Sequence, residues 1–216
     1  MTDMRATRTI DRKPQILEAA AQCFAQGGFH RATMQDVARS AGMVPGNLYH
    51  YFSSKEAIIE ELVERDRAAI AQDFAALAES THLMDAFRTL GRKHFIEEPR
   101  EKAILSLQIW SEAALDPKIA AHIATLHEEV RQGIVSVCQA AKHRGEIHPD
   151  ADIDAIARLI LILSDGLVRR RAIDPDYDSE KEVEFVLNLI GALLDGAVQP
   201  TALCPSRAAD EKELVL

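Results

Sequence analysis

The chain has 216 residues, of which 47% are hydrophobic and only 5% aromatic, so it is long enough to build a core for one or two domains. Its sequence contains no apolar run that could span a bilayer, and the N-terminus carries charges without the apolar segment of a signal peptide. These features exclude a membrane-spanning class, and we expect a soluble cytoplasmic protein with no membrane partner.

The net charge of −9 is distributed unevenly along the chain. Residues 1–55 hold seven Lys and Arg side chains against four Asp and Glu, so a mildly basic first quarter precedes an acidic remainder. An acidic remainder weakens non-specific adhesion to DNA but leaves a local basic patch in place. The overall charge therefore does not exclude a nucleic-acid partner.

Three cysteines, Cys23, Cys138 and Cys204, are odd in number and lack the spacing of metal ligands. We expect Cys23 and Cys138 to be packing residues, with a redox role as the alternative. The histidines also lack metal-ligand spacing, since His122 and His127 are five residues apart and leave a helix in different directions. We expect no metal site and no cofactor.

In chain order, residues 1–11 read as a polar arm whose Arg5 and Arg8 are available to DNA, with a frayed tail as the alternative. A helix is predicted from Lys13 to Gln26, ended by two glycines. The residues expected in the small core beside it are Ile16, Ala20, Cys23, Phe24 and Phe29.

A short helix is predicted to begin after Thr33, because apolar residues then recur at helical spacing. Thr33 and Asp36, three residues apart, have the spacing of a capping box. Gly42 stands where this helix should stop and the chain should turn through a left-handed conformation. Pro45 then suits the first turn of a second helix, over about Val44–Tyr51.

This second helix is too short to be stable alone, so we expect Val44 and Leu48 to anchor it to its neighbours. The remaining flat and hydrogen-bonding side chains are then free for a partner. A helix-turn-helix places such a second helix in the DNA major groove. The residues expected to contact DNA are Thr33, Val44, Gly46, Asn47, Tyr49, His50, Tyr51 and Lys55.

Lys55 lies in the first turn of the next helix, where a cation opposes the helix dipole. A phosphate partner would explain this placement, because helix N-termini and lysines both attract phosphate. An exposed lysine offset by Glu56 is the alternative.

The rest of the chain reads as a series of helices without a strand or an internal repeat. The last two have apolar surface beyond what one subunit readily covers, which favours a bundle formed across a two-fold axis; a monomer with a well-buried helix is the alternative. Residues 200–216 have no periodic pattern and are expected to be disordered. The predicted helices span about 54–79, 83–97, 101–115, 117–143, 152–172 and 181–197.

The spacing of Gly46, Leu48, Tyr49, Phe52 and Lys55 resembles the Gly-x-Leu-Tyr-x-x-Phe-x-x-Lys pattern of TetR-family transcriptional regulators. The resemblance to their DNA-binding domain extends over about residues 12–62. Residues 43–45, Met-Val-Pro, depart from the Val-Ser that many members carry, which puts a serine–phosphate contact in doubt. Residues 107–175 are similar to the C-terminal domain of the BetI-like branch. That similarity is carried by Ile109-Trp110, Asp116-Pro117, the Gly145–Pro149 break and Ser164-Asp165-Gly166-Leu167.

The resemblance implies an all-α protein with a three-helix DNA-binding domain over residues 1–55 and a helical effector-binding and dimerisation domain over residues 56–199. It also implies a homodimer, formed through about residues 152–172 and 181–197, that binds double-stranded DNA at a palindromic operator. Bundles bind small molecules between their helices. The candidates for contact with an effector of unknown identity are Phe74, Phe87, Leu90, His94, Leu105, Gln108, Trp110, Glu112, His122 and Asp165. Glu112 and Asp165 would favour a cationic effector if both faced inward.

The leading hypothesis is therefore a ligand-responsive transcriptional repressor and not an enzyme. One alternative is an all-helical enzyme, although the sequence contains no nucleophile elbow, phosphate loop or dinucleotide fingerprint. Another is a DNA-binding regulator or activator whose body is filled and takes no effector.

Overall fold

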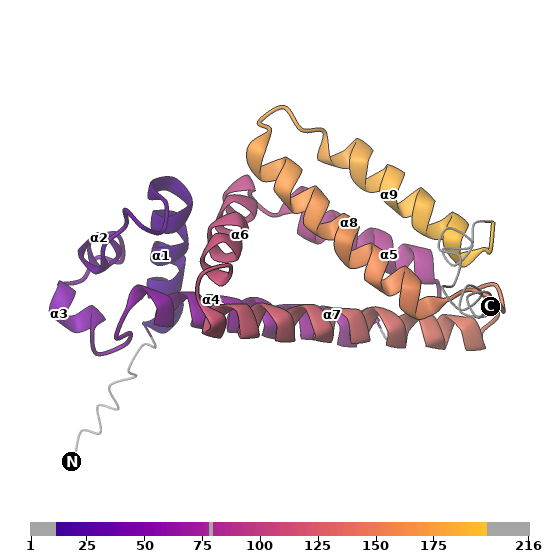
Figure 1. Ribbon diagram of the computed structural model, residues 1–216, viewed down its shortest axis with the longest axis horizontal. Coiled ribbons are helices and arrows are strands. Elements are labelled where there is room, and N and C mark those ends of the chain that lie inside the picture. Colours follow the sequence, from indigo (N-terminus) through magenta and orange to yellow (C-terminus); the bar gives the residue numbers. More distant parts are fainter. Residues whose placement is uncertain (1–11, 78–79, 198–216) are drawn as a thin grey trace, which may run out of the picture. The chain divides into compact units, whose positions relative to one another are not determined.

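A computed structural model describes residues 12–77 and 80–197, and these residues form helices without a strand, which confirms the all-α prediction (Figure 1). The predicted arm, the predicted helix end at 79, Cys204 and the tail after residue 200 lie outside the described residues. The helices are α1 (Lys13–Gly27), α2 (Met34–Ser40), α3 (Pro45–Leu48), α4 (Lys55–Leu77), α5 (Leu83–Arg92), the π-helix η1 (Lys93–Glu97), α6 (Arg100–Ala113), α7 (Pro117–His143), α8 (Ile153–Ile173) and α9 (Ser179–Leu194).

The helices divide into two compact units. The head unit comprises the chain up to Asp66 together with Ile104–Ile123, and the body unit comprises Arg67–Ala103 and the chain from Ala124 onward. The division therefore falls inside α4, α6 and α7. The predicted domain boundary at residue 55 remains a prediction. Among the residues that the structure describes, no helix is both long and apolar enough to cross a membrane.

The core of the head unit forms where α1 packs against α2 and the chain returns through α3 into α4. Phe24 and Phe29 meet edge to face with their ring centroids 5.2 Å apart, a favourable geometry for aromatic pairs. Phe29 comes directly after the two glycines that end α1, and the second of these, Gly28, has a φ of 79°. Other fully buried members of this core are Ile16, Ala20, Val37, Leu48, Ile58 and Leu62.

The N-terminus of α2 and the turn between α2 and α3 have the predicted chemistry. Thr33 Oγ1 accepts from the amide of Asp36 at 3.1 Å, and the Asp36 carboxylate accepts from the amide of Thr33 at 3.0 Å. This capping box satisfies amides that the first helical turn leaves unpaired. Gly42 then has a φ of 66°, and the amide of Met43 reaches back to the carbonyl of Ala38. The chain is thereby turned into α3.

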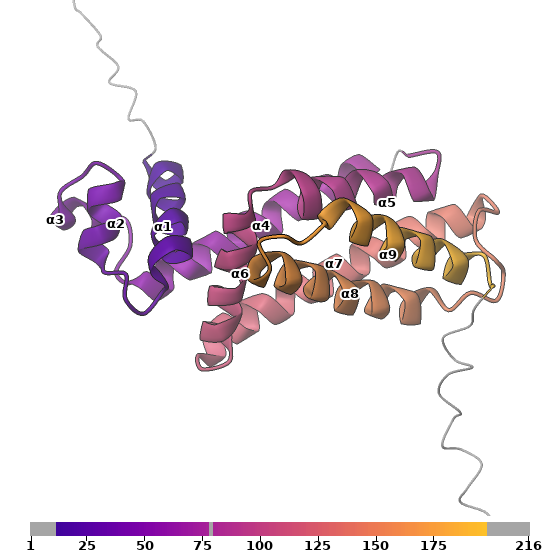
Figure 2. The same ribbon diagram turned by 90° about the horizontal axis from the view of Figure 1, so that it is seen from above.

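In the body unit, α9 packs on both α8 and α5 (Figure 2). The residues that meet there are apolar at helical spacing, so three amphipathic faces close one core. Asp152 and Asp178 cap the N-termini of α8 and α9 through their side chains. Buried members of this core include Leu83, Phe87, Ile134, Cys138, Ile156, Val183, Leu187, Ile190 and Leu194.

Arginine side chains complete the C-terminal end of α8. Arg100 donates to the carbonyls of Arg171 and Ala172, at 3.1 Å and 2.7 Å. Arg171 in turn donates to the carbonyls of Ile96 and Glu98. These carbonyls lie at helix ends, where they have no intrahelical partner, so the arginines connect α8, η1 and α6 within the body unit.

Replacing Gly133 with alanine should lower the free energy of unfolding by about 1–3 kcal/mol, the usual cost of overpacking. A Cβ at residue 133 would lie 2.7 Å from the ring of Phe74, so this ring or the helices on either side of it would have to move. Thermal or denaturant unfolding measures the effect. Gly27→Ala is the control, because a Cβ there meets no atom within 4 Å. Equal unfolding curves for Gly133→Ala and the native protein would contradict the close packing.

Candidate nucleic-acid interface and polar networks

The turn and α3 present side chains that the fold itself does not use. Tyr49 is 55% exposed and Tyr51 38% exposed, so two large aromatic rings on one short segment lie partly in solvent. Gly46, Asn47 and His50 are also exposed on this segment. Polar and aromatic groups gathered on one short exposed helix are typical of a binding surface.

Leu48 anchors this segment, as predicted, since its side chain is fully buried. The prediction that Val44 shares this role is wrong, because Val44 is 62% exposed. The reason is local geometry: α3 begins at Pro45, and Val44 is its N-cap with extended backbone, φ −77° and ψ 144°. The four-residue spacing that brings two side chains to one helix face therefore does not apply. Val44 is instead available to a partner.

Lys55 has an intramolecular role. Its Nζ donates to the carbonyl of Phe29 at 2.7 Å and lies 4.4 Å from the centroid of the Phe29 ring. The first turn of α4 thus holds the connection between α1 and α2 through a hydrogen bond and a cation–π contact. Thr33 also has an internal partner in its capping box. Contacts of Thr33 and Lys55 with DNA remain predictions.

Replacing Lys55 with methionine should lower the free energy of unfolding by about 1–2 kcal/mol, because the variant cannot form this half-buried, charge-assisted hydrogen bond although its side chain has a similar length. Chemical unfolding measures this change. The predicted phosphate contact is tested separately, by the salt dependence of DNA affinity, whose slope falls by about 1 for each phosphate that the protein no longer binds. Unchanged stability would contradict the role seen in the fold.

Two candidates for effector contact lie elsewhere, in contact with this same α1–α2 connection. Gln108 Oε1 accepts from the amide of Phe29 at 3.1 Å, and Glu112 Oε1 lies 3.0 Å from His30 Nε2. Glu112 is only 8% exposed, and the contact with His30 gives its carboxylate a polar partner that compensates for this burial. His30 was not among the sequence candidates. A lone exposed histidine before α2 gives no signal of a carboxylate 82 residues away in the chain.

The remaining effector candidates divide between the two units. Leu105, Trp110 and His122 belong to the head unit, with Leu105 buried and the other two half-buried. Phe74, Phe87, Leu90, His94 and Asp165 belong to the body unit, where Phe87 is in the core. Direct ligand contact by any of the ten remains a prediction.

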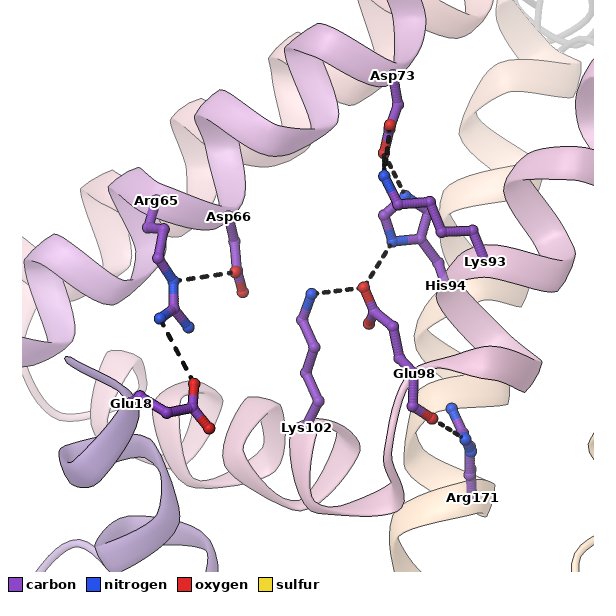
Figure 3. A network of polar contacts seen from close by, with 9 residues as sticks. All are labelled: Glu18, Arg65, Asp66, Asp73, Lys93, His94, Glu98, Lys102 and Arg171. Atoms are coloured by element: carbon purple, nitrogen blue, oxygen red, sulfur yellow. Dashed lines mark hydrogen bonds and ion pairs between the residues drawn. The ribbon is translucent and has the colours of Figure 1, made fainter. Parts of the chain in front are cut away.

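His94 lies in the middle of a polar network in the body unit (Figure 3). Its Nε2 is 2.9 Å from Asp73 Oδ2 on α4, and its Nδ1 is 3.3 Å from Glu98 Oε1. Lys93 and Lys102 donate to the same two carboxylates, at 2.5 Å and 2.7 Å. Both Lys93 and His94 belong to the π-helix η1, and their side chains contact the same carboxylate, that of Asp73.

Figure 3 also shows a separate group in the head unit, in which Arg65 lies 4.0 Å from both Glu18 and Asp66.

The charges of this network compensate one another. Burial alone would raise the pKa of Glu98, but hydrogen bonds from His94 and Lys102 outweigh it and hold that pKa below its ordinary value. Glu98 is therefore ionised at neutral pH. The network joins α4, η1 and α6 as a structural clamp, and a ligand at His94 would have to displace a carboxylate.

Asp165 and Cys138 have environments that limit their chemistry. Burial raises the pKa of Asp165, while His127, whose Nε2 lies 3.9 Å from Asp165 Oδ1, opposes that shift.

Burial also raises the pKa of the Cys138 thiol to about 12, so this cysteine is a neutral packing residue at pH 7. Cys23 is half-buried on α1. Within residues 12–77 and 80–197, no three metal-binding side chains gather into a site.

A cavity of about 270 Å³ lies in the body unit between α4, α5 and α7. Its walls are mostly apolar, with Phe74 the one effector candidate that lines it. The sequence does not single out its other members, because each reads as an ordinary helix position. They include Leu77, Leu83, Val137, Ser136 and Arg144.

Two family profiles match this sequence. The profile of "Bacterial regulatory proteins, tetR family" matches residues 16–62, and that of "BetI-type transcriptional repressor, C-terminal" matches residues 92–195. Together they cover more than two thirds of the chain. The first covers α2 and α3, and the second covers η1 and most of the body unit.

Individual relatives agree with the profiles. The HTH-type transcriptional regulator UidR of Escherichia coli K12 is 29% identical over 168 residues, covering 78% of this chain and 85% of its own. The HTH-type transcriptional repressor KstR2 of Mycobacterium tuberculosis H37Rv is 27% identical over 161 residues, covering 73% and 80%. Among solved structures, Salmonella enterica GusR aligns with a TM-score of 0.73 at 27% identity, covering 88% of this chain and 98% of its own.

Proposed function

Because this chain belongs to the TetR family of ligand-responsive transcriptional repressors, we propose that it binds a palindromic operator as a homodimer and leaves it when a small molecule binds in the body unit. It acts in the cytoplasm, by binding and not by turnover. The observation that carries the DNA-reading role is the exposed run from Val44 to Tyr51, in which Leu48 is the one buried residue. The exposed groups of this run suit base edges and phosphates in the major groove.

Dimerisation is supported by apolar side chains on the last two helices. Ile162 on α8 is 67% exposed and Phe185 on α9 is 66% exposed, although each belongs to an otherwise core-facing helix. Leu159, Val186 and Leu189 are only partly buried by the chain's own core. A second copy packed on this surface would give a dimer with two DNA-binding domains, as a two-fold operator requires.

Selection of bound fragments from random double-stranded DNA tests the proposal. We expect the enriched sequences to be inverted repeats, with half-sites centred about one helical turn or a multiple of it apart. Sedimentation of the complex should then give an even number of chains per DNA. Enrichment of a single unrepeated site, bound by one chain, would contradict the proposal that the protein binds DNA as a dimer.

A further inference from the structure

The cavity between α4, α5 and α7 has a specific chemical character. Its apolar walls come from all three helices, for example Phe74 from α4, Leu83 from α5 and Val137 from α7. Gly133 lets the ring of Phe74 lie directly on α7 and so shapes the inner wall. Among the described residues that line it, Arg144 is the only charged one. The cavity is therefore a mostly apolar pocket, open to solvent on the side of Ser136, Ala140 and Arg144, with the Arg144 guanidinium at its exposed side.

Its volume indicates the size of the group that it can cover. An apolar cavity of about 150 Å³ accommodates a benzene molecule. At about 270 Å³, this cavity accommodates on the order of ten non-hydrogen atoms. It is large enough for a medium-length alkyl chain or a substituted ring.

Arg144 is held at the cavity by one of its nitrogens. Its Nε donates to Glu146 Oε1 at 2.6 Å, and Glu146 Oε2 accepts from the amide of Leu83 at 2.8 Å. These two bonds hold the pKa of Glu146 below its ordinary value, the Leu83 amide having the larger effect. The terminal amino groups of Arg144, which are the pair best suited to a carboxylate, have no hydrogen-bond partner among the residues that the structure describes.

We propose that this cavity binds a compact apolar molecule with a single carboxylate, whose head group accepts hydrogen bonds from Arg144 and whose body lies against Phe74 and Val137. The inference rests on the proposed function, since it gives the chemical class of the effector. It replaces the expectation of a cationic effector. Glu112 is paired with His30 in the head unit, and Asp165 does not line this cavity.

Octanoate, with ten non-hydrogen atoms, is the probe, and isothermal titration calorimetry on the full-length protein is the measurement. We expect saturable binding that is at least tenfold weaker in Arg144→Gln. Octanamide, which has the same shape without the charge, should bind at least tenfold more weakly than octanoate. Equal binding of the acid and the amide, unchanged affinity in Arg144→Gln, or no binding of octanoate up to millimolar concentration would overturn the proposal.

A second variant gives an effect of opposite sign. Glu146→Gln keeps a hydrogen-bond acceptor for the Leu83 amide but removes the charge that competes for Arg144, so octanoate should bind about two- to fivefold more tightly. Weaker binding in Glu146→Gln would count against a carboxylate at Arg144. Ala140→Phe, which places a ring in the cavity, should abolish binding while the protein remains folded by circular dichroism.

Operator release is measured separately, so that the two proposals fail independently. Arg144-dependent binding of octanoate with unchanged DNA affinity would support the ligand class and overturn this cavity as the effector site. Loss of DNA affinity on adding octanoate to the native protein, but not to Arg144→Gln, would support both.

Discussion

Replacing Asn47 with alanine is expected to weaken operator binding by about 5- to 150-fold and to leave the stability of the protein unchanged. A side-chain amide that reads a base edge contributes about 1–3 kcal/mol of discrimination. Asn47 lies on the exposed surface of α3, two residues after the proline that begins the helix, where a recognition helix reaches the bases. Surface substitutions usually change the free energy of unfolding by less than about 0.5 kcal/mol. The substitution should therefore lower DNA affinity without a measurable change in stability.

Fluorescence anisotropy with the selected operator measures the weakening, and competition with singly changed operators shows at which base pair the preference is relaxed. Gln139→Ala provides the matched control, because it also removes an exposed amide from a helix, in the body unit. Equal affinities of Asn47→Ala and Gln139→Ala for the operator would show that Asn47 does not contribute to DNA binding.

Replacing Leu48 with alanine is expected to lower the free energy of unfolding by about 2–5 kcal/mol, the range for large-to-small changes at buried leucines. Leu48 is the buried residue of α3, a helix of four residues that cannot hold its own shape in water. The truncated side chain would leave a hole against the head core and release the DNA-facing turn. Operator binding should therefore fall together with stability.

Val44→Ala is the companion substitution, four residues earlier in the same segment. Val44 is exposed, so its truncation should change the free energy of unfolding by less than about 0.5 kcal/mol, while operator affinity would still fall if the side chain touches DNA. Urea unfolding of both variants measures the difference. Comparable destabilisation by the two substitutions would mean that Val44 packs against the head in solution, contrary to the fold described above.

Local patterns in the sequence were sufficient for most of the fold. The capping box at Thr33, the left-handed Gly42 and the cap at Asp152 involve residues within four positions of one another, so their chemistry is visible in the sequence. The helix-turn-helix follows from the same short-range signals. The observed helix ends differ from the predicted ones by a few residues. For example, α9 begins at Ser179 with Asp178 as its cap, two residues before the predicted start at Lys181.

The partners of the site residues could not be predicted, because they come from distant parts of the chain. Lys55 meets the carbonyl of Phe29, 26 residues before it, and Gln108 meets the amide of the same residue from 79 positions away. The π-helical turn that directs His94 onto Asp73 leaves no mark in the hydrophobic pattern. Arg144 is a solvent-exposed residue just after the end of α7, and only the packing of three helices shows that it lies beside a cavity.

Selective recognition of DNA by the exposed α3 segment is the central claim, and anisotropy of the full-length protein on DNA from immediately upstream of its own gene tests it most directly. The measurement is made at two salt concentrations, against unrelated DNA of the same length. We predict tight binding that weakens steeply with salt and exceeds binding to unrelated DNA by at least about 10³-fold. Affinity equal to that for unrelated DNA, together with failure to enrich any sequence from a random pool, would contradict it.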